Sequence, residues 1–293
     1  KKLNEKELSY LGYQEKPISS LDKNWKKEQQ LLFRSKKLGD DRDRALLKPN
    51  GELTYFMSDI LYHQEKIERN FDILLNIWGI DHSGYVKRLK NSISALNPKK
   101  EINFVIKLTA LVNLLEGKKT VKMSKRKGNY ITLREVVEKV GSDVLRFMMI
   151  SRNADKKIDF DFETVKLKTK DNPVFYVQYA NARIFSILER AKSLNILTND
   201  KVLSSTDLNK LSTESELSII RKLSEWPNVI FYSASRYEPH RIAFYLNELA
   251  QLFHSLQSLG KIDHSMKFLV EEDMQLTSAR IALIRSIQII ITS

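Results

Sequence analysis

The sequence contains no cysteine among its 293 residues, which excludes a disulfide framework and any metal site built on thiolates. No two of its five histidines stand four residues apart, and no metal site is predicted. No apolar run approaches the roughly 20 residues of a membrane helix, and the N-terminus has no signal-peptide core. The longest apolar candidate covers only residues 287–291. We therefore expect a cytoplasmic protein of the reducing cytosol, with no membrane partner.

Positive charge is present in excess. The chain has 49 Lys and Arg against 36 Asp and Glu, a formal net charge of +13 and a pI near 9.6. Lysine and arginine that displace counterions gain affinity for nucleic acid, so a polyanion is the natural partner. The length and the apolar fraction of 42% allow two domains with real cores.

The first half of the chain has an α/β pattern after about fifty charged, irregular residues. Residues 54–70 predict a helix that places Tyr55 and Asp59 on one face, and the apolar run 71–81 predicts a strand buried on both faces of a parallel sheet. A helix over Ser83 to Leu96 and a strand over 102–108 complete a βαβ unit. Ligands bind beyond the carboxyl ends of such strands, where Asp81 and His82 stand.

After the basic residues around 118–127, Thr132 and Glu135 form a capping box that opens one helix, and Ser142 is expected to cap the next. From residue 171 onward the sequence predicts helices only. Pro173 is well placed as the first residue of a long amphipathic helix. Further helices are expected over 216–235 and 239–259, with 195–215 as a surface loop. We place the domain boundary so that residues 1–165 form one domain and 166–293 the other.

A basic loop, "TVKMSKRKGNYIT" at residues 120–132, joins the two patterns. Six of the ten positions from Lys118 to Lys127 are basic and none is acidic, so the loop repels itself unless an anion binds it. Lysines on a loop suit a triphosphate, because they can neutralise the charge that develops as a phosphoryl bond breaks. Composition alone would favour a solvated basic turn instead.

The order of the residues in this loop points to a family. "KMSKRKG" closely resembles the Lys-Met-Ser-Lys loop of class I aminoacyl-tRNA synthetases, and the surrounding text resembles the bacterial arginyl-tRNA synthetases over nearly the whole chain. The similar stretches are residues 31–67, 76–90, 121–152, 159–162 and 172–183. The resemblance implies the second half of a Rossmann-like catalytic domain followed by a helical-bundle anticodon-binding domain.

The resemblance also implies a reaction. ATP would activate L-arginine to the adenylate with release of pyrophosphate, Mg²⁺ would accompany ATP, and the arginyl group would pass to tRNA(Arg). Lys125, assisted by Lys122, would be catalytic by stabilising the pyrophosphate leaving group. Lys125, Met123, Ser124 and His82 would bind ATP.

The arginine site is implied by a Tyr-x-x-x-Asp element, which matches Tyr55 and Asp59, with Asp81 lining the same pocket. A guanidinium needs a planar, charge-assisted acceptor, and a carboxylate provides one. The alternative for Tyr55 and Asp59 is a core aromatic and an acid in the first turn of a helix, which periodicity alone does not reject.

The helical half resembles an anticodon-binding domain, and its segment "FYVQYANAR" offers rings and hydrogen-bonding groups to unpaired bases. The residues that we expect to bind tRNA are Tyr176, Gln178, Tyr179, Asn181 and Arg183. The resemblance favours a monomer.

One family motif is missing. No His-x-Gly-His string, which grips ATP in class I synthetases, occurs in these residues, and the family's N-terminal tRNA-elbow domain has no counterpart. We therefore expect a fragment that does not activate arginine by itself. Two alternatives stay open. The first is a cysteinyl-type synthetase, although the zinc ligands that it needs are absent. The second is a non-catalytic tRNA-binding module, which would bind tRNA regardless of Lys125.

Overall fold

The structure is a computed structural model that describes residues 2–14, 28–121, 130–196 and 198–293. The chain divides into two compact units, residues 1–111 and 112–293. The predicted boundary after residue 165 differs from this division, and it stays a prediction.

The N-terminal region contains a sheet that the sequence pattern did not reveal. After α1 (Lys2–Glu5), strands β1 (Ser9–Tyr13), β2 (Gln29–Phe33) and β3 (Arg44–Ala45) pair antiparallel in the order β1-β2-β3, with the 3-10 turn η1 (Ser35–Leu38) following β2. Phe33 and Leu46 are fully buried in the same hydrophobic cluster as Phe56 of the next helix. The expectation of an irregular start was therefore wrong.

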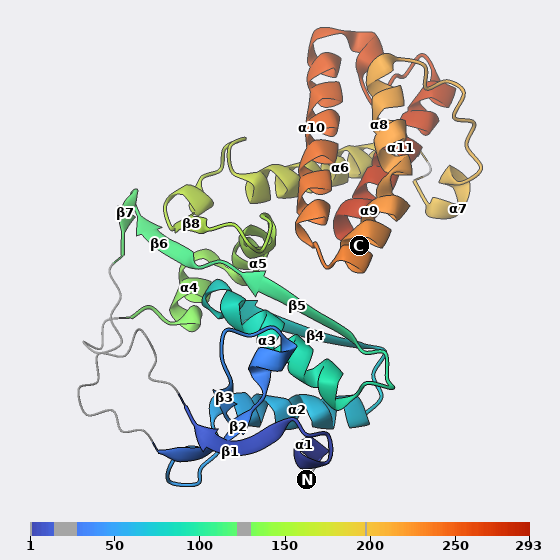
Figure 1. Ribbon diagram of the computed structural model, residues 1–293. Helices are drawn as coiled ribbons and strands as arrows, with labels where there is room; N and C mark the ends of the chain where they lie inside the picture. Colours follow the sequence, from blue (N-terminus) through green and yellow to red (C-terminus); the bar gives the residue numbers. More distant parts are fainter. Residues whose placement is uncertain (1, 15–27, 122–129, 197) are drawn as a thin grey trace. The chain divides into compact units, whose positions relative to one another are not determined.

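The predicted βαβ unit is confirmed. Helix α2 (Tyr55–Glu68) begins after Thr54, whose hydroxyl accepts from the Met57 N–H at 3.3 Å. Strand β4 (Ile73–Gly79), the 3-10 turn η2 (Ile80–His82), helix α3 (Ser83–Leu96) and strand β5 (Asn103–Thr109) follow. Strands β4 and β5 pair parallel along their whole length, and α2 and α3 pack on each other (Figure 1).

Strand β4 is not buried on both faces, which corrects the prediction. Leu74 and Asn76 are buried, whereas the alternate residues Ile73, Leu75 and Ile77 are exposed. Leu74 belongs to the cluster formed with Ile60 of α2 and Ile93 of α3, so these helices cover one face. Within the described part of this unit the other face of β4 stays open to solvent.

The second unit opens with a small sheet. Strands β6 (Val112–Glu116), β7 (Lys119–Thr120) and β8 (Ile158–Asp161) have the order β7-β6-β8, with β6 and β8 parallel. Helices α4 (Leu133–Val140) and α5 (Ser142–Ile150) lie between β7 and β8 in the chain, and the turn η4 (Thr164–Lys166) follows β8. The Thr132–Glu135 capping box is confirmed, because the Thr132 N–H donates a hydrogen bond to Glu135 Oε2 at 2.6 Å.

Ser142 does not cap α5, so that prediction was wrong. Ser142 is the first residue of the helix, and its hydroxyl donates to Asp143 Oδ1 at 3.3 Å. Gly141 occupies the cap position with a φ of 86°, a left-handed value that a glycine adopts without strain.

The rest of the chain is helical, as predicted. The helices are α6 (Pro173–Ser193), α7 (Asp200–Leu203), α8 (Glu214–Ser224), α9 (Trp226–Arg236), α10 (His240–Ile262) and α11 (Met274–Thr292), with the 3-10 turn η5 (His264–Met266) before α11. Pro173 is the first residue of α6, as predicted. The single helix expected over 216–235 is two helices, because Pro227 falls in the first turn of α9. The loop expected over 195–215 contains α7 and buries Leu203 and Leu211.

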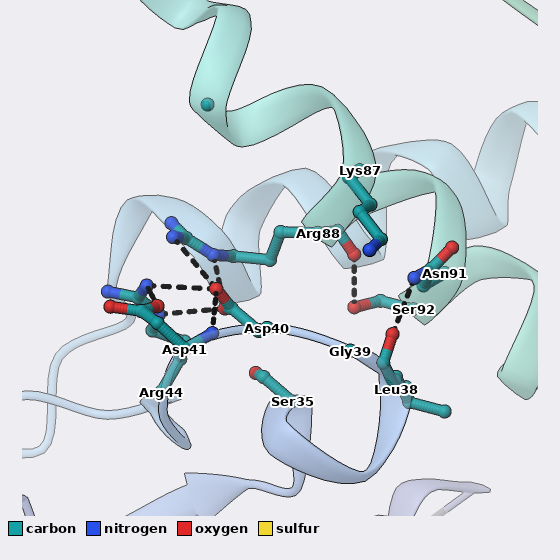
Figure 2. A pocket seen from close by; sticks show the side chains of 11 residues that line it. Ser35, Leu38, Gly39, Asp40, Asp41, Arg44, Lys87, Arg88, Asn91 and Ser92 are labelled. Atoms are coloured by element: carbon teal, nitrogen blue, oxygen red, sulfur yellow. Dashed lines mark hydrogen bonds and ion pairs between the residues drawn. The ribbon is translucent and has the colours of Figure 1, made fainter.

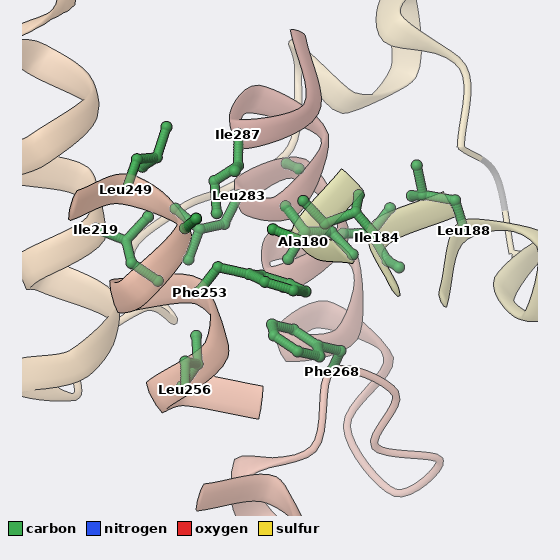
Figure 3. Packing of buried hydrophobic residues seen from close by; sticks show 14 of the residues in the cluster. Ala180, Ile184, Leu188, Ile219, Leu249, Phe253, Leu256, Phe268, Leu283 and Ile287 are labelled. Atoms are coloured by element: carbon green, nitrogen blue, oxygen red, sulfur yellow. The ribbon is translucent and has the colours of Figure 1, made fainter. Parts of the chain in front are cut away.

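The bundle has one continuous apolar core. Ile184 of α6, Ile219 of α8, Leu249 of α10 and Ile287 of α11 are all fully buried in it (Figure 3). The Phe253 and Phe268 rings stack at 5.7 Å with 16° between their planes. This core holds α6, α8, α10 and α11 together, since apolar burial is the dominant favourable contribution to folding.

Helix α11 is long and apolar enough to cross a membrane by composition alone, and half of it is buried inside the bundle. Arg280, in the middle of α11, is only 2% exposed. Its Nε donates to Glu216 Oε1 at 2.7 Å, and its Nη1 donates to the Ser265 and Lys267 carbonyls, each at 2.6 Å. The ion pair and the apolar core together hold α11 in this bundle.

Candidate functional site

A cavity of about 470 Å³ lies in the first unit, where α2 and the start of α3 meet β4. Titratable groups and aromatic rings surround it, and apolar residues of β4 complete it. The lining residues are Asp59, Tyr62, His63, Lys66, Leu75, Asn76, Ile77, Trp78, His82 and Tyr85. A cavity at the end of a parallel strand is a usual ligand site in α/β sheets.

Asp59 is the one carboxylate among these lining residues. Its Oδ2 accepts a hydrogen bond from the Tyr85 hydroxyl at 2.8 Å. The Trp78 ring lies 5.7 Å from the Tyr85 ring and is tilted by 41°. A carboxylate beside aromatic faces suits a planar cation, which gains both charge-assisted hydrogen bonds and contact with the rings.

A buried histidine supports the inner side of the cavity. His63 Nδ1 lies 2.8 Å from the Asp59 carbonyl oxygen, and its Nε2 lies 2.7 Å from the Asn76 side-chain nitrogen. Because that nitrogen can only donate, Nε2 accepts and Nδ1 carries the proton. Burial lowers the pKa of His63, which agrees with a neutral ring. Lys66 donates to the Asn76 oxygen at 3.0 Å, and the network ties α2 to β4.

The structure brings two of the four site residues expected in this unit to the cavity, namely Asp59 and His82. Tyr55 stands in the first turn of α2, 93% exposed, and does not line the cavity. Asp81 is exposed as well, with its Oδ2 3.6 Å from His82 Nε2. The expected roles of Tyr55 and Asp81 in arginine binding stay predictions.

The basic loop lies outside the described residues. Lys122, Met123, Ser124 and Lys125, which were predicted to bind ATP and stabilise the leaving group, are therefore not described here. Strand β7 ends just before the loop at Thr120, and the capped helix α4 begins just after it at Leu133.

Eight of the ten residues that line the cavity were not predicted from the sequence as site residues, among them Trp78 and Tyr85. Both lie within the stretch 76–90 on which the resemblance rests, but no motif marks them. Tyr85 follows His82 by three residues and lies in the first turn of the helix predicted after the strand. This position near a strand end is the signal in the sequence that could have indicated a site residue.

The second unit carries a run of aromatic rings on α6 and α10. The Phe175 and Tyr179 rings stack at 5.6 Å and 14°, and the Tyr179 and His254 rings stack at 5.2 Å and 21°. The Tyr176 ring lies 4.5 Å from the His254 ring and is tilted by 43°. Arg183 donates to the Tyr179 hydroxyl from Nε at 2.6 Å. We call Phe175, Tyr176, Tyr179 and His254 the ring cluster.

The five residues expected to bind tRNA do not form one surface. Tyr176 and Tyr179 belong to the ring cluster, and Arg183 contacts it. Asn181 instead accepts from the Gln288 side chain of α11 at 3.5 Å, which ties it into the bundle. Gln178 is exposed. Among the described residues, no side-chain hydrogen bond or ion pair joins Asn181 or Gln178 to the ring cluster.

A groove of about 350 Å³ extends from Arg183 along α6 and the end of α10. Four of its lining side chains are basic, namely Arg183, Arg190, Lys261 and Lys267. Its floor is apolar and contains Phe268 and Leu269. The groove, here called the basic groove, could hold an anion such as a nucleic-acid phosphate, to which such residues donate.

The sequence matches two family descriptions. Residues 53–162 match the family "tRNA synthetases class I (I, L, M and V)", and residues 177–293 match the "DALR anticodon binding domain". The chain is 47% identical over 291 residues to an arginine–tRNA ligase of Wolbachia pipientis from Culex pipiens, covering 99% of this chain and 50% of the relative. An arginine–tRNA ligase of Ruegeria pomeroyi is 46% identical with the same coverage.

A solved structure is also similar. A protein of Campylobacter jejuni assigned as an arginyl-tRNA synthetase superposes with a TM-score of 0.78 at 25% identity, over 99% of this chain and 58% of the other. The arginyl-tRNA synthetase of Thermus thermophilus shares the fold, with a TM-score of 0.61 over 89% of this chain at 18% identity. The chain spans about half the length of the curated relatives that it matches.

Proposed function

The chain belongs to the arginine–tRNA ligase family, and on that premise we propose that it supplies the arginine pocket, the Lys-Met-Ser-Lys loop and the RNA-binding domain of such a ligase. The whole enzyme would join L-arginine to ATP, release pyrophosphate and transfer the arginyl group to tRNA(Arg). One observation carries the proposal. The cavity presents a carboxylate, Asp59, beside the aromatic rings of Trp78 and Tyr85, which is an environment made for a guanidinium.

The residues have separate roles in this proposal. Asp59 accepts hydrogen bonds from N–H groups of the guanidinium, and His82, which lines the same cavity, contacts ATP. Lys125, assisted by Lys122, neutralises the pyrophosphate as it leaves, which needs only position and charge. Mg²⁺ would accompany ATP and supply positive charge to its phosphates. The described residues include no group of three or more His, Cys, Asp or Glu that could hold a metal ion by themselves.

Arginine-dependent exchange of labelled pyrophosphate into ATP tests the proposal. We expect the full-length gene product to catalyse this exchange and the 293-residue chain alone to show none, because the chain contains no His-x-Gly-His motif for ATP. Exchange that depends on cysteine would support the cysteinyl-type alternative instead. A full-length product that binds tRNA without any exchange, and whose Lys125→Ala variant binds equally well, would support a non-catalytic binding module.

The helical domain is proposed to bind tRNA(Arg). The ring cluster offers π-faces to unpaired bases, and the basic groove beside it offers cations to the phosphates. This division fits RNA recognition, in which backbone contacts position the molecule and base contacts select it. We further propose that the ligase acts as a cytoplasmic monomer.

Arg190 of the basic groove provides a test of tRNA binding. Replacing Arg190 with alanine is expected to weaken tRNA binding about three- to tenfold and to reduce the slope of log K against log salt by about one, because one phosphate contact is lost. Binding of labelled tRNA(Arg) at several salt concentrations measures both.

Lys192→Ala is the matched control. Lys192 lies two residues further along α6, is paired with Glu189 at 2.7 Å and does not line the basic groove. Its replacement should leave the affinity for tRNA within about twofold of that of the unsubstituted protein. Equal effects of the two substitutions would refute a role for the groove.

A further inference from the structure

Tyr85 and Asp59 line the same cavity but lie on different helices. Asp59 lies on α2 and Tyr85 lies 26 residues later in the first turn of α3, yet the Tyr85 hydroxyl reaches Asp59 Oδ2 at 2.8 Å. Asp59 Oδ1 accepts no hydrogen bond from the part of the chain that the structure describes. One carboxylate oxygen is therefore occupied, and the other is available to a ligand.

The Tyr85 ring has little freedom to move. The Phe56 ring meets it edge-on at 6.2 Å, the Trp78 ring lies 5.7 Å away, and the Arg88 guanidinium lies over it at 5.4 Å. Aromatic pairs and a cation over a ring each prefer such geometries. A ring held on several sides keeps its hydroxyl pointing in one direction.

Arg88 is itself paired with the Asp40 carboxylate (Figure 2). Its Nε donates to Asp40 Oδ2 at 2.6 Å, and Arg44 binds the same carboxylate through two hydrogen bonds of 2.9 and 3.0 Å. Burial by itself would raise the pKa of Asp40, but the hydrogen bonds from Arg44 and Arg88 outweigh it and hold that pKa far below its usual range. Asp40 is therefore an anion at any ordinary pH and keeps Arg88 over the ring.

The hydroxyl of Tyr85 determines how the carboxylate is presented. The terminal torsion of an aspartate is broad, so an unrestrained carboxylate rotates easily. A donor on Oδ2 stops this rotation and leaves the lone pairs of Oδ1 in a fixed direction. Burial raises the pKa of Tyr85, and the hydrogen bond to Asp59 raises it further, so the hydroxyl stays protonated and remains a donor.

We propose that Tyr85 is a positioning residue for arginine, which holds the Asp59 carboxylate so that Oδ1 faces the guanidinium, and that Arg88 and Asp40 keep Tyr85 in place. The inference rests on the proposed function, because it assumes that the cavity binds arginine. Tyr85 acts through Asp59, so its loss should affect arginine rather than ATP.

Tyr85→Phe in the full-length gene product tests the inference. The change removes only the hydroxyl, and we expect the KM for arginine in pyrophosphate exchange to rise about tenfold, as for one hydrogen bond to a charged group, while kcat and the KM for ATP stay within about twofold. Asp40→Asn, which weakens the hold on Arg88 from outside the cavity, should raise the KM for arginine by about threefold without changing that for ATP. This second variant tests the same contacts if Tyr85→Phe folds poorly.

Tyr10→Phe is the matched control. The Tyr10 hydroxyl also donates to a carboxylate, Asp43 Oδ2, at 2.8 Å in the same unit, but neither residue lines the cavity. A similar loss of thermal stability in both Tyr→Phe variants with a raised KM in Tyr85→Phe alone supports the inference. An unchanged KM for arginine, an equal rise in the control, or a parallel rise in the KM for ATP overturns it. The unsubstituted enzyme is assayed first, and a lack of arginine-dependent exchange there would refute the proposed function itself.

Discussion

Replacing Asp59 with asparagine in the full-length gene product is expected to lower kcat/KM for arginine by at least about a hundredfold, with the KM for ATP unchanged. Asparagine keeps the size of the side chain but removes the negative charge, and its NH₂ group would face the N–H donors of the guanidinium. Loss of one partner of a buried, hydrogen-bonded charge pair costs about 2–5 kcal/mol, and a hundredfold corresponds to about 2.7 kcal/mol. Pyrophosphate exchange at varied arginine concentrations measures the change.

Asp72→Asn serves as the control for this prediction. Asp72 is an exposed carboxylate in the same unit, just before β4, and does not line the cavity. Its substitution should leave kcat/KM within about twofold. If Asp59→Asn behaved like Asp72→Asn, the cavity would not be the arginine site, and the assignment of Asp59 would have to be abandoned.

Replacing Arg280 with leucine is expected to lower the free energy of unfolding of the helical bundle by about 3–5 kcal/mol. The Glu216 carboxylate, fully buried, would lose its charged partner, and the Ser265 and Lys267 carbonyls would lose their donor. This is a large share of the roughly 5–15 kcal/mol that stabilises an ordinary domain. Denaturant unfolding of the 293-residue chain, followed by helical circular dichroism, measures the change.

The same substitution elsewhere on α11 provides the comparison. Arg285 pairs with Asp200 at 2.7 Å, but both side chains are partly exposed to solvent, so Arg285→Leu should cost only about 0–1 kcal/mol. Adding Glu216→Gln to Arg280→Leu should recover part of the loss, because the unpaired buried charge is removed. Equal losses in the two arginine variants would show that the buried pair does not stabilise the bundle.

The stabilising contribution of the Glu216–Arg280 pair should depend on pH. Burial alone would raise the pKa of Glu216, but the hydrogen bonds from Arg280 and Thr213 outweigh it and place that pKa below its ordinary value of 4.5. A carboxyl whose pKa is lowered by folding contributes stability that is present above its unfolded pKa and is lost as the pH falls below it. The contribution of this pair is therefore complete at neutral pH.

Local sequence signals predicted the elements that depend on neighbouring residues. The Thr132–Glu135 box, Pro173 at the start of α6 and the helix over Ser83 to Leu96 were all confirmed, because caps and helical periodicity involve residues at most a few positions apart. The sheet of β1, β2 and β3 was missed. Its strands are short, and they pair across long chain separations that no local pattern reveals, such as Tyr10 with Leu32.

The sequence by itself indicated the family and the order of an α/β segment before a helical one, and it named Asp59 as a site candidate, because motifs and periodicity involve residues close together in the chain. Only the tertiary structure decided which residues share the cavity. In it, Tyr55 is exposed to solvent and Tyr85 and Trp78 line the cavity. Arg280 is buried and paired with Glu216. The physical reason is that helix packing sets these contacts between residues 26 and 64 positions apart, and no local pattern encodes them.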